Sequence, residues 1–310
     1  MKSHPYMKQI FVFLIAITIF SCEKDKIKKD DPDIVTPGNF AEAKTELNKI
    51  YGKDDNAAQV MDIYLPANRS TSTTKVILLV HGGAWAVGDK NGSEDDPYIK
   101  TLLDSVRKRY PDWAIFNMNY RLATLSGKNV FPTQENDMAT AVKYIYDNRQ
   151  AFGISDKWVF MGMSSGAHMV LLQAYKNSSP IRPKAVVDFY GPTDMTGLYN
   201  FHKADGDLAP LIEKLMSGTP SSNAALYNSS SPINFVNAQS PPTLIMHGGK
   251  DDTVPEAQSL ALSAKLKEAG VTTVYGDYYS FPYQTHGWSD PVLWRETMKL
   301  ISNFLTVNVP

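Results

Sequence analysis

Cysteine is nearly absent from this sequence: Cys22 is the only one among 310 residues, so the chain cannot form an internal disulfide bond. An excess of charge of either sign is also missing, because 31 basic residues stand against 32 acidic ones and the formal net charge is −1. Proteins that bind nucleic acid usually carry a clustered basic surface. The balanced charge gives no indication of such a partner, and we expect none.

The N-terminal apolar run, residues 10–20, has about a dozen residues, whereas a membrane-spanning helix needs about 20. Lysines precede the run and a small residue follows it, which is the order of a secretory signal. Ile19, Ser21 and Cys22 resemble the lipobox of bacterial lipoproteins, in which cleavage leaves the cysteine first and lipid-modified. The resemblance implies a signal peptide at residues 1–21 and a lipid on Cys22 that anchors the protein to a membrane of the bacterial cell envelope. Secretion without a lipid is the alternative.

The next segment, residues 22–39, is rich in Lys, Asp and Pro and poor in large apolar side chains. Such a composition cannot bury a core, so we expect a flexible tether. Of the whole chain, 43% is hydrophobic, which is ordinary for a globular protein. We therefore expect residues 40–310 to form one large α/β domain without internal repeats.

Strand and helix patterns alternate along this domain. Residues 76–80 are a continuous apolar run, which is typical of a strand buried on both faces. The strands predicted are Val60–Leu65, Val76–His81, Trp113–Asn119, Trp158–Met161, Ala185–Phe189, Thr243–His247 and Thr273–Tyr279. The helices predicted are Tyr98–Arg109, Gln134–Asn148, Ser165–Tyr175, Pro255–Ala269 and Pro291–Leu305. The alternation predicts a mostly parallel sheet flanked by helices on both faces.

One segment breaks this alternation. Residues 197–242 are rich in Ser, Asn and Pro, and a connection of that length in a compact domain usually has a function. We interpret it as a cap insertion, made of short helices, over a substrate pocket.

A Gly-x-Ser-x-Gly sequence at residues 162–166 lies between a predicted strand and a predicted helix. A serine on such a turn has the setting of a nucleophile elbow, because flanking glycines permit the tight, strained backbone. The start of the following helix also favours negative charge. We predict that Ser164 is a nucleophile and that the backbone N–H of Ser165 helps to stabilise an oxyanion.

A glycine turn, His-Gly-Gly-Ala-Trp at residues 81–85, follows the central apolar strand. Paired glycines let the main chain approach a ligand and direct N–H groups at it, so this turn is the expected source of the other oxyanion donors.

An acid and a base are available late in the chain. Asp251 and Asp252 both follow the predicted strand at residues 243–247, and chain order does not choose between them. His286 follows about 35 residues after the first of these, just before the final helix. A carboxylate that orients an imidazole, which in turn accepts a serine proton, is the arrangement of a catalytic triad.

These motifs resemble the α/β-hydrolase superfamily, close to its hormone-sensitive-lipase-like and bacterial feruloyl- and carboxylesterase-like branches. The order Ser, Asp, His is that of the superfamily. The resemblance implies a serine esterase, identifies Asp251 as the triad acid, and assigns oxyanion donors to Gly83 and Ala84. The matching stretches are residues 61–66, 81–85, 119–122, 162–166, 231–233, 241–245 and 247–255.

The remaining candidates are less specific. Trp85, Tyr190 and Trp288 flank the motifs, and we predict that they line the substrate pocket, with core packing as the alternative. The other histidines are predicted to be structural: His81, His168, His202 and His247. No grouping of Cys, His, Asp or Glu has metal-ligand spacing and no phosphate-binding glycine loop occurs, so we expect no metal and no cofactor.

The expected partner is a small-molecule or glycan ester, and the sequence leaves the oligomeric state open. A first alternative function is that of an arylformamidase, because residues 81–85 resemble the His-Gly-Gly-x-Trp turn of kynurenine formamidases. A second alternative is a catalytically silent, lipid-anchored binding module that has kept the fold of a hydrolase.

Overall fold

The computed structural model describes residues 40–53, 57–93, 97–177, 179–205, 208–271 and 278–310. The predicted signal peptide, the lipid-bearing Cys22 and the tether lie outside the described residues. All the described residues belong to one compact unit, within residues 35–310. In this unit, every described helix is too short or too polar to cross a membrane.

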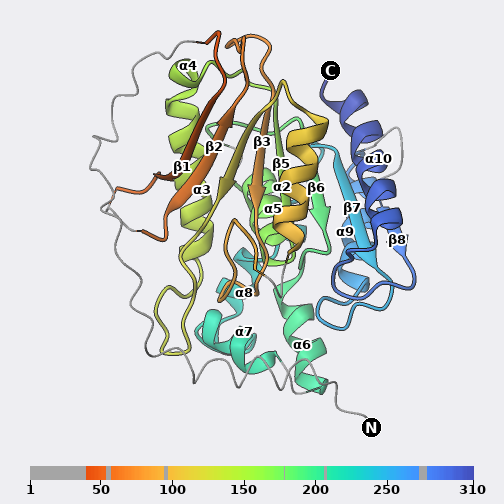
Figure 1. Cartoon of the computed structure of the whole chain (residues 1–310). Helices are drawn as coiled ribbons and strands as arrows, with labels where there is room; N and C mark the ends of the chain where they lie inside the picture. Colours follow the sequence, from red (N-terminus) through yellow and green to blue (C-terminus); the bar gives the residue numbers. More distant parts are fainter. Residues whose placement is uncertain (1–39, 54–56, 94–96, 178, 206–207, 272–277) are drawn as a thin grey trace. The chain divides into compact units, whose positions relative to one another are not determined.

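The described strands form one eight-stranded sheet in the order β1-β2-β4-β3-β5-β6-β7-β8 (Figure 1). The pairs β1·β2 and β2·β4 are antiparallel, and every other neighbouring pair is parallel. The sheet is therefore mostly parallel, as the strand–helix alternation predicts. The strands are β1 (Lys44–Ile50), β2 (Val60–Leu65), β3 (Val76–Val80), β4 (Ala114–Met118), β5 (Trp158–Met163), β6 (Ala185–Phe189), β7 (Thr243–Gly248) and β8 (Tyr278–Phe281).

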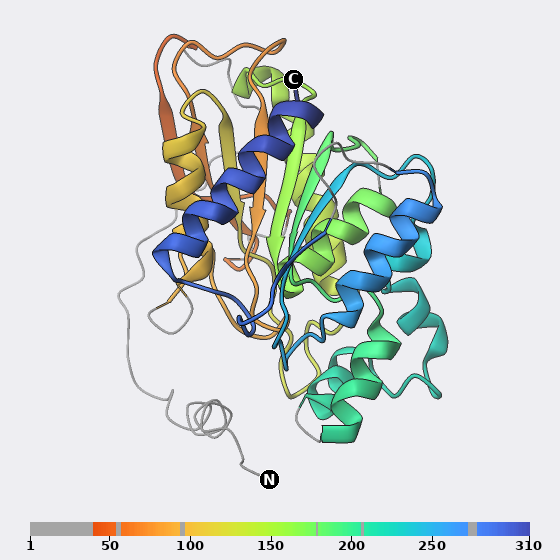
Figure 2. The same ribbon diagram turned by 90° about the vertical axis from the view of Figure 1, so that its right-hand side faces the viewer.

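Helices cover both faces of the sheet (Figures 1 and 2). Alternate residues of β3 belong to different cores: Leu78 packs with residues of α3, α5 and α9, and Ile77 packs with residues of α2 and α10. Both side chains are fully buried, which explains the unbroken apolar run of this strand. The helices are α2 (Tyr98–Arg109), α3 (Thr133–Asp147), α4 (Arg149–Phe152), α5 (Ser165–Tyr175), α9 (Ala257–Glu268) and α10 (Pro291–Asn308).

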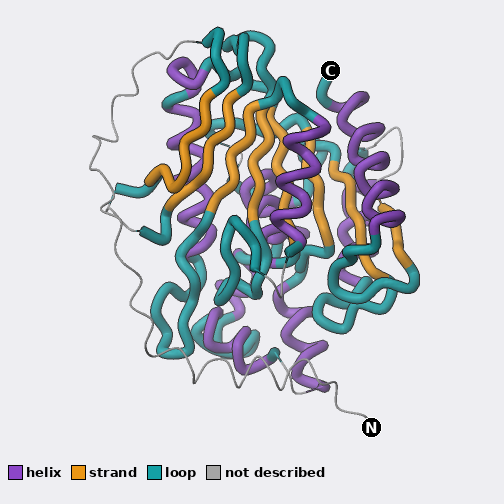
Figure 3. Tube along the Cα trace, viewed as in Figure 1, coloured by secondary structure: helices purple, strands orange, loops and turns teal. Residues whose placement is uncertain are grey.

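The segment predicted as a cap contains short helices, which lie beyond the carboxyl ends of the parallel strands (Figures 1 and 3). They begin slightly earlier than expected, at Met195. Their buried side chains join the core cluster that covers one face of the sheet, as Tyr227 does with 0% exposure. The segment is thus packed onto the domain rather than separate from it. Its helices are α6 (Met195–Asp205), α7 (Ala209–Leu215), α8 (Ala224–Ser229) and the 3₁₀ helix η1 (Pro232–Phe235).

Sequence patterns predict most of these elements to within two or three residues, and they predict α2 and α5 at their observed bounds. The same patterns miss the edge strand β1. Most side chains of β1 are exposed, and buried and exposed positions do not alternate regularly along it. Backbone hydrogen bonds to β2, rather than apolar burial, therefore define this strand. Of the strand predicted at Thr273–Tyr279, residues 273–277 lie outside the described residues, and the observed β8 continues to Phe281.

Candidate active site

Ser164 lies on a sharp turn between the end of β5 and the start of α5. Its backbone has φ +52° and ψ −122°, a strained conformation for a residue with a side chain. The turn requires glycine at residues 162 and 166, because the neighbouring backbone leaves no space for a side chain at either position. A Cβ on Gly166 would lie 2.3 Å from the carbonyl oxygen of Val80. The serine is thereby held beyond the carboxyl edge of the sheet, at the amino end of a helix.

The structure brings Ser164, His286 and Asp251 into one hydrogen-bonded series. The Oγ of Ser164 lies 2.9 Å from Nε2 of His286, and Nδ1 of the same ring lies 2.7 Å from Oδ2 of Asp251. The imidazole is 23% exposed, whereas the Asp251 side chain is fully buried. Asp251 therefore occupies the acid position that chain order alone left open between it and Asp252.

The carboxylate of Asp251 is fixed from several sides. Its Oδ1 accepts hydrogen bonds from the backbone N–H groups of Thr253 and Val254, at 2.9 and 2.8 Å. Burial by itself would raise the pKa of Asp251, but hydrogen bonds from His247 and His286 hold it well below its ordinary value. The group is ionised wherever the triad could operate.

The loops that carry the acid and the base are joined by backbone hydrogen bonds. The N–H of Gly249 donates to the carbonyl of Phe281, and that of Lys250 donates to the carbonyl of Gln284, both at 2.9 Å. Gly248 approaches the backbone of Thr285 so closely that a Cβ would lie 2.2 Å from its carbonyl oxygen. Residues that are 35 positions apart in sequence are thus held in a fixed relation.

The glycine turn after β3 lies against the serine. A Cβ on Gly82 would be 3.2 Å from Cβ of Ser164. Gly83 and Ala84 have φ of +109° and +50°, so the chain turns tightly here. No hydrogen bond within the described part of the chain uses their backbone N–H groups. Ser165 begins α5, where N–H groups lack partners within the helix. The predicted oxyanion donors therefore flank the nucleophile.

Tyr120 connects the glycine turn with the elbow, a role that sequence reasoning does not predict. Its hydroxyl donates to the carbonyl of Gly82 at 3.1 Å and lies 3.2 Å from Oγ of Ser165. Its ring stacks on that of His81, with centroids 4.4 Å apart. The position follows β4 within a stretch that resembles the superfamily, and that resemblance is the only signal for it in the sequence.

A buried ion pair fixes the loop that continues from the glycine turn to residue 90. Nζ of Lys90 lies 2.9 Å from Oδ2 of Asp62 on β2, and each side chain is 2% exposed. The backbone N–H of Lys90 donates to the side chain of Asn119, whose amide donates to Asp89. The loop that supplies the predicted oxyanion donors is therefore attached at both ends to the sheet.

The three predicted pocket residues are all about 3% exposed. The indole N–H of Trp85 donates to Nδ1 of His168, and that of Trp288 donates to Oγ1 of Thr297. Both indoles thus lie in the core rather than along an open pocket. The Tyr190 ring meets the His286 ring edge to face, with centroids 4.7 Å apart, so it supports the imidazole.

The other histidines are engaged within the fold. Burial lowers the pKa of both His81 and His168 to about 4, so their rings are neutral near pH 7. Nε2 of His202 lies 2.7 Å from the carbonyl of Thr253, and His247 contacts Asp251. Among the described residues, no group of three or more His, Cys, Asp or Glu side chains could hold a metal ion.

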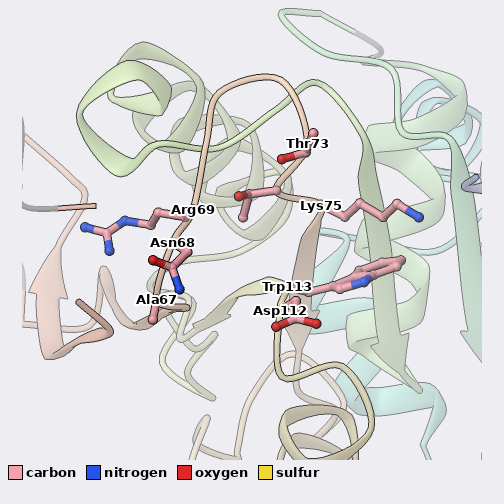
Figure 4. Close-up of a pocket in the computed structure, with 8 residues that line it drawn as sticks. Ala67, Asn68, Arg69, Thr73, Lys75, Asp112 and Trp113 are labelled. Atoms are coloured by element: carbon pink, nitrogen blue, oxygen red, sulfur yellow. The ribbon is translucent and has the colours of Figure 1, made fainter. Parts of the chain in front are cut away.

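A cavity of about 330 Å³ lies at the amino ends of β3 and β4, away from the carboxyl ends that carry Ser164 (Figure 4). Its cationic groups already have partners: Nζ of Lys75 donates to the carbonyl of Val309, and Nε of Arg69 donates to that of Phe152. In Figure 4 the Arg69 guanidinium points away from Lys75 and Trp113. Nothing in this cavity converges on a reacting group.

A mostly parallel sheet with a serine elbow, a histidine and an aspartate at its carboxyl edge defines an α/β-hydrolase fold. Comparison with known proteins identifies the family within this fold. Residues 61–266, well over half of the chain, match the BD-FAE family, and the protein belongs to it.

Curated relatives include two esterases of Mycobacterium tuberculosis. The chain is 28% identical to esterase LipQ over 246 residues, which cover 75% of the chain and 55% of that protein. It is 27% identical to the probable carboxylic ester hydrolase LipM over 229 residues, 70% of the chain and 50% of that protein. The chain spans about half the length of these curated relatives.

Solved structures with the same fold include one that is described as a carbohydrate esterase. A truncated carbohydrate esterase from gut microbiota has a TM-score of 0.67 at 24% identity, with 87% of this chain and 99% of that one covered. A bifunctional GH43-CE protein of Bacteroides eggerthii has a TM-score of 0.68 at 25% identity, with 86% of this chain and 35% of that one covered.

Proposed function

We propose that this protein is a serine hydrolase that cleaves carboxylic esters through an acyl-enzyme on Ser164. The observation that carries the proposal is the continuous hydrogen-bonded series from Ser164 Oγ through the His286 imidazole to the Asp251 carboxylate, with contacts of 2.9 and 2.7 Å. The esterases among its relatives support it.

In the first half-reaction, His286 Nε2 accepts the hydroxyl proton as Ser164 Oγ attacks the ester carbonyl carbon. The carbonyl oxygen becomes an oxyanion, which the backbone N–H groups of Gly83, Ala84 and Ser165 stabilise. Collapse of this intermediate breaks the bond to the alcohol, which takes the proton from the imidazole. Water then attacks the acyl-enzyme while His286 accepts its proton; the bond to Ser164 Oγ breaks, Oγ takes that proton back from the imidazole, and the acid is released. Asp251 orients the ring and stabilises its charged form.

We propose esters of small or medium acyl groups, including those attached to carbohydrate, as the substrate class. One solved relative is described as an acetyl ester-xyloside bifunctional hydrolase from Caldicellulosiruptor lactoaceticus, and another as a carbohydrate esterase. His286 is partly exposed, which fits a reacting centre that can accept an ester with a bulky alcohol group such as a sugar. The formamidase alternative is weakened because Trp85, the distinctive residue of its turn, is buried against His168.

The test combines active-site labelling with a substrate panel. A fluorophosphonate probe is expected to label the protein once, on the peptide that contains Ser164, as read by mass spectrometry. Purified protein that begins after residue 22 is then offered p-nitrophenyl acyl esters, an acetylated xylooligosaccharide, methyl ferulate and N-formylkynurenine. We expect turnover of the esters. Labelling elsewhere, or turnover of the formamide alone, would reject the proposal.

We also propose that a lipid on Cys22 anchors the protein in a bacterial cell envelope, on the resemblance of residues 19–22 to a lipobox. Cells that express the full chain and are fed labelled palmitate are expected to yield a labelled band, which sediments with the membranes. The variant Cys22→Ser should lose both the label and the sedimentation. A labelled Cys22→Ser protein would contradict the proposal, and so would a soluble, unlabelled wild-type protein.

A further inference from the structure

A second imidazole contacts the carboxylate of the triad. His247, on β7, places Nε2 3.2 Å from Oδ2 of Asp251, the same oxygen that lies 2.7 Å from Nδ1 of His286. The His247 ring is fully buried, so it cannot reach a substrate. With two backbone N–H groups on Oδ1 and two rings on Oδ2, the carboxylate has four partners. The three-residue series therefore continues to a fourth side chain.

The contacts of the His247 ring define where its protons are. Nε2 faces two acceptors, Asp251 and the carbonyl of Val254 at 2.8 Å, so this nitrogen carries hydrogen. Nδ1 lies 2.6 Å from Oγ of Ser259 on α9. A hydroxyl can donate to a neutral Nδ1 or accept from a protonated one. The ring can thus take up a second proton without moving any heavy atom.

The groups around the ring favour the charged form. Burial alone would lower the pKa of His247, but the hydrogen bond and charge of Asp251 raise it above its ordinary value, with smaller contributions from the Val254 carbonyl and from Asp188. Asp188, on β6, is buried, and burial raises its pKa to about 7. Among the described residues, further titratable neighbours are His286, across the carboxylate, and Tyr190, whose ring centroid is 6.5 Å away.

We propose that His247 is a positioning residue that fixes the triad carboxylate and, when its ring takes up the second proton, lowers the basicity of His286. This inference rests on the proposed function. A cation behind Asp251 offsets part of the negative charge that favours a protonated His286. The charge on His247 thus opposes the charge of Asp251 at the imidazole that accepts the serine proton.

The test is the variant His247→Gln, because a glutamine amide can still donate to Asp251 but carries no charge. The pH dependence of kcat/KM for p-nitrophenyl acetate is measured between about pH 4.5 and 9, a range that spans the ordinary pKa of histidine. We expect the acid limb of the variant to move to higher pH by about one unit, as a single charge at this range produces. We expect the plateau to fall less than about tenfold, since the hydrogen bond is retained.

A second variant keeps the test informative if His247→Gln does not fold. Ser259→Ala removes only the hydroxyl that accepts from a charged ring, and it should move the acid limb in the same direction by a smaller amount. If His247 had only a structural role, its substitution would lower the plateau of kcat/KM and leave the acid limb at the same pH. That result would overturn the inference.

The rate of fluorophosphonate labelling, followed over the same pH range, separates the two proposals. Wild-type protein that is never labelled at Ser164 would remove the proposed function, and this inference with it. Labelling of wild-type and His247→Gln with coincident acid limbs would remove the inference alone.

Discussion

Ser164→Ala is expected to reduce kcat for p-nitrophenyl acetate by about 10⁴-fold or more, with rates measured against an enzyme-free blank. The substitution removes the only hydroxyl within hydrogen-bond distance of Nε2 of His286 among the described residues, so no acyl-enzyme can form. Any residual rate would come from direct attack of water on the ester, with the oxyanion donors stabilising the intermediate. The backbone at this position keeps its φ of +52°, so the thermal midpoint should change by no more than a few degrees.

Ser165→Ala is the matched comparison. Its hydroxyl contacts Tyr120 rather than His286, and its backbone N–H is kept, so we expect a loss of at most about tenfold. Comparable losses in the two variants would mean that the elbow had been deformed and not that a nucleophile had been removed. An unchanged rate in Ser164→Ala would exclude this residue from the mechanism.

The parts of the fold that are buried on both sides could be predicted from sequence. Residues 76–80 have no polar position because each side of the strand faces a helical layer, and the continuous run follows from that. β1 could not be predicted in the same way. Leu47 is 61% exposed, and the strand exists because β2 offers it backbone partners, which leave no trace in hydrophobic periodicity.

The residues of the candidate site also differ in how far the sequence predicts them: those in a local motif could be predicted, and those that depend on distant packing could not. Ser164 was predictable because an elbow is a local structure, defined by glycines two residues away on either side. The choice of Asp251 over Asp252 needed the resemblance, since which carboxylate meets His286 depends on two loops far apart in sequence. His247 stands four residues before Asp251 in the same stretch that resembles the superfamily, but its contact with that carboxylate depends on how β7 and its following loop pack.

Aromatic residues beside motifs were the weakest indicators. Trp288 stands two residues after His286, yet its indole packs on Phe281 with centroids 4.4 Å apart. Proximity in sequence to a reacting residue does not say which way a large side chain points. For a tryptophan the free energy of burial is large enough that the core is the usual destination.

Gly166→Ala is expected to lower kcat/KM for p-nitrophenyl acetate by about 10²-fold or more, because it should misplace the whole elbow. The added Cβ would lie 2.3 Å from the carbonyl oxygen of Val80 and 2.4 Å from that of His81, both in the backbone. Neither atom can rotate away, so the start of α5 must move by about 1 Å, a displacement large enough for such a loss. Overpacking of this kind costs about 1–3 kcal/mol, or several degrees in the thermal midpoint.

Gly270→Ala is the control that separates a steric clash from the general effect of losing a glycine. Gly270 has φ +77°, but a Cβ there would meet nothing within 4 Å. The strained backbone should cost about 1–2 kcal/mol of stability and leave kcat/KM unchanged. If the clash at Gly166 is what matters, activity and stability fall together there and only stability falls at Gly270. Equal activity in both variants would mean that the elbow tolerates displacement, and that the close contact between α5 and the end of β3 does not set the position of Ser164.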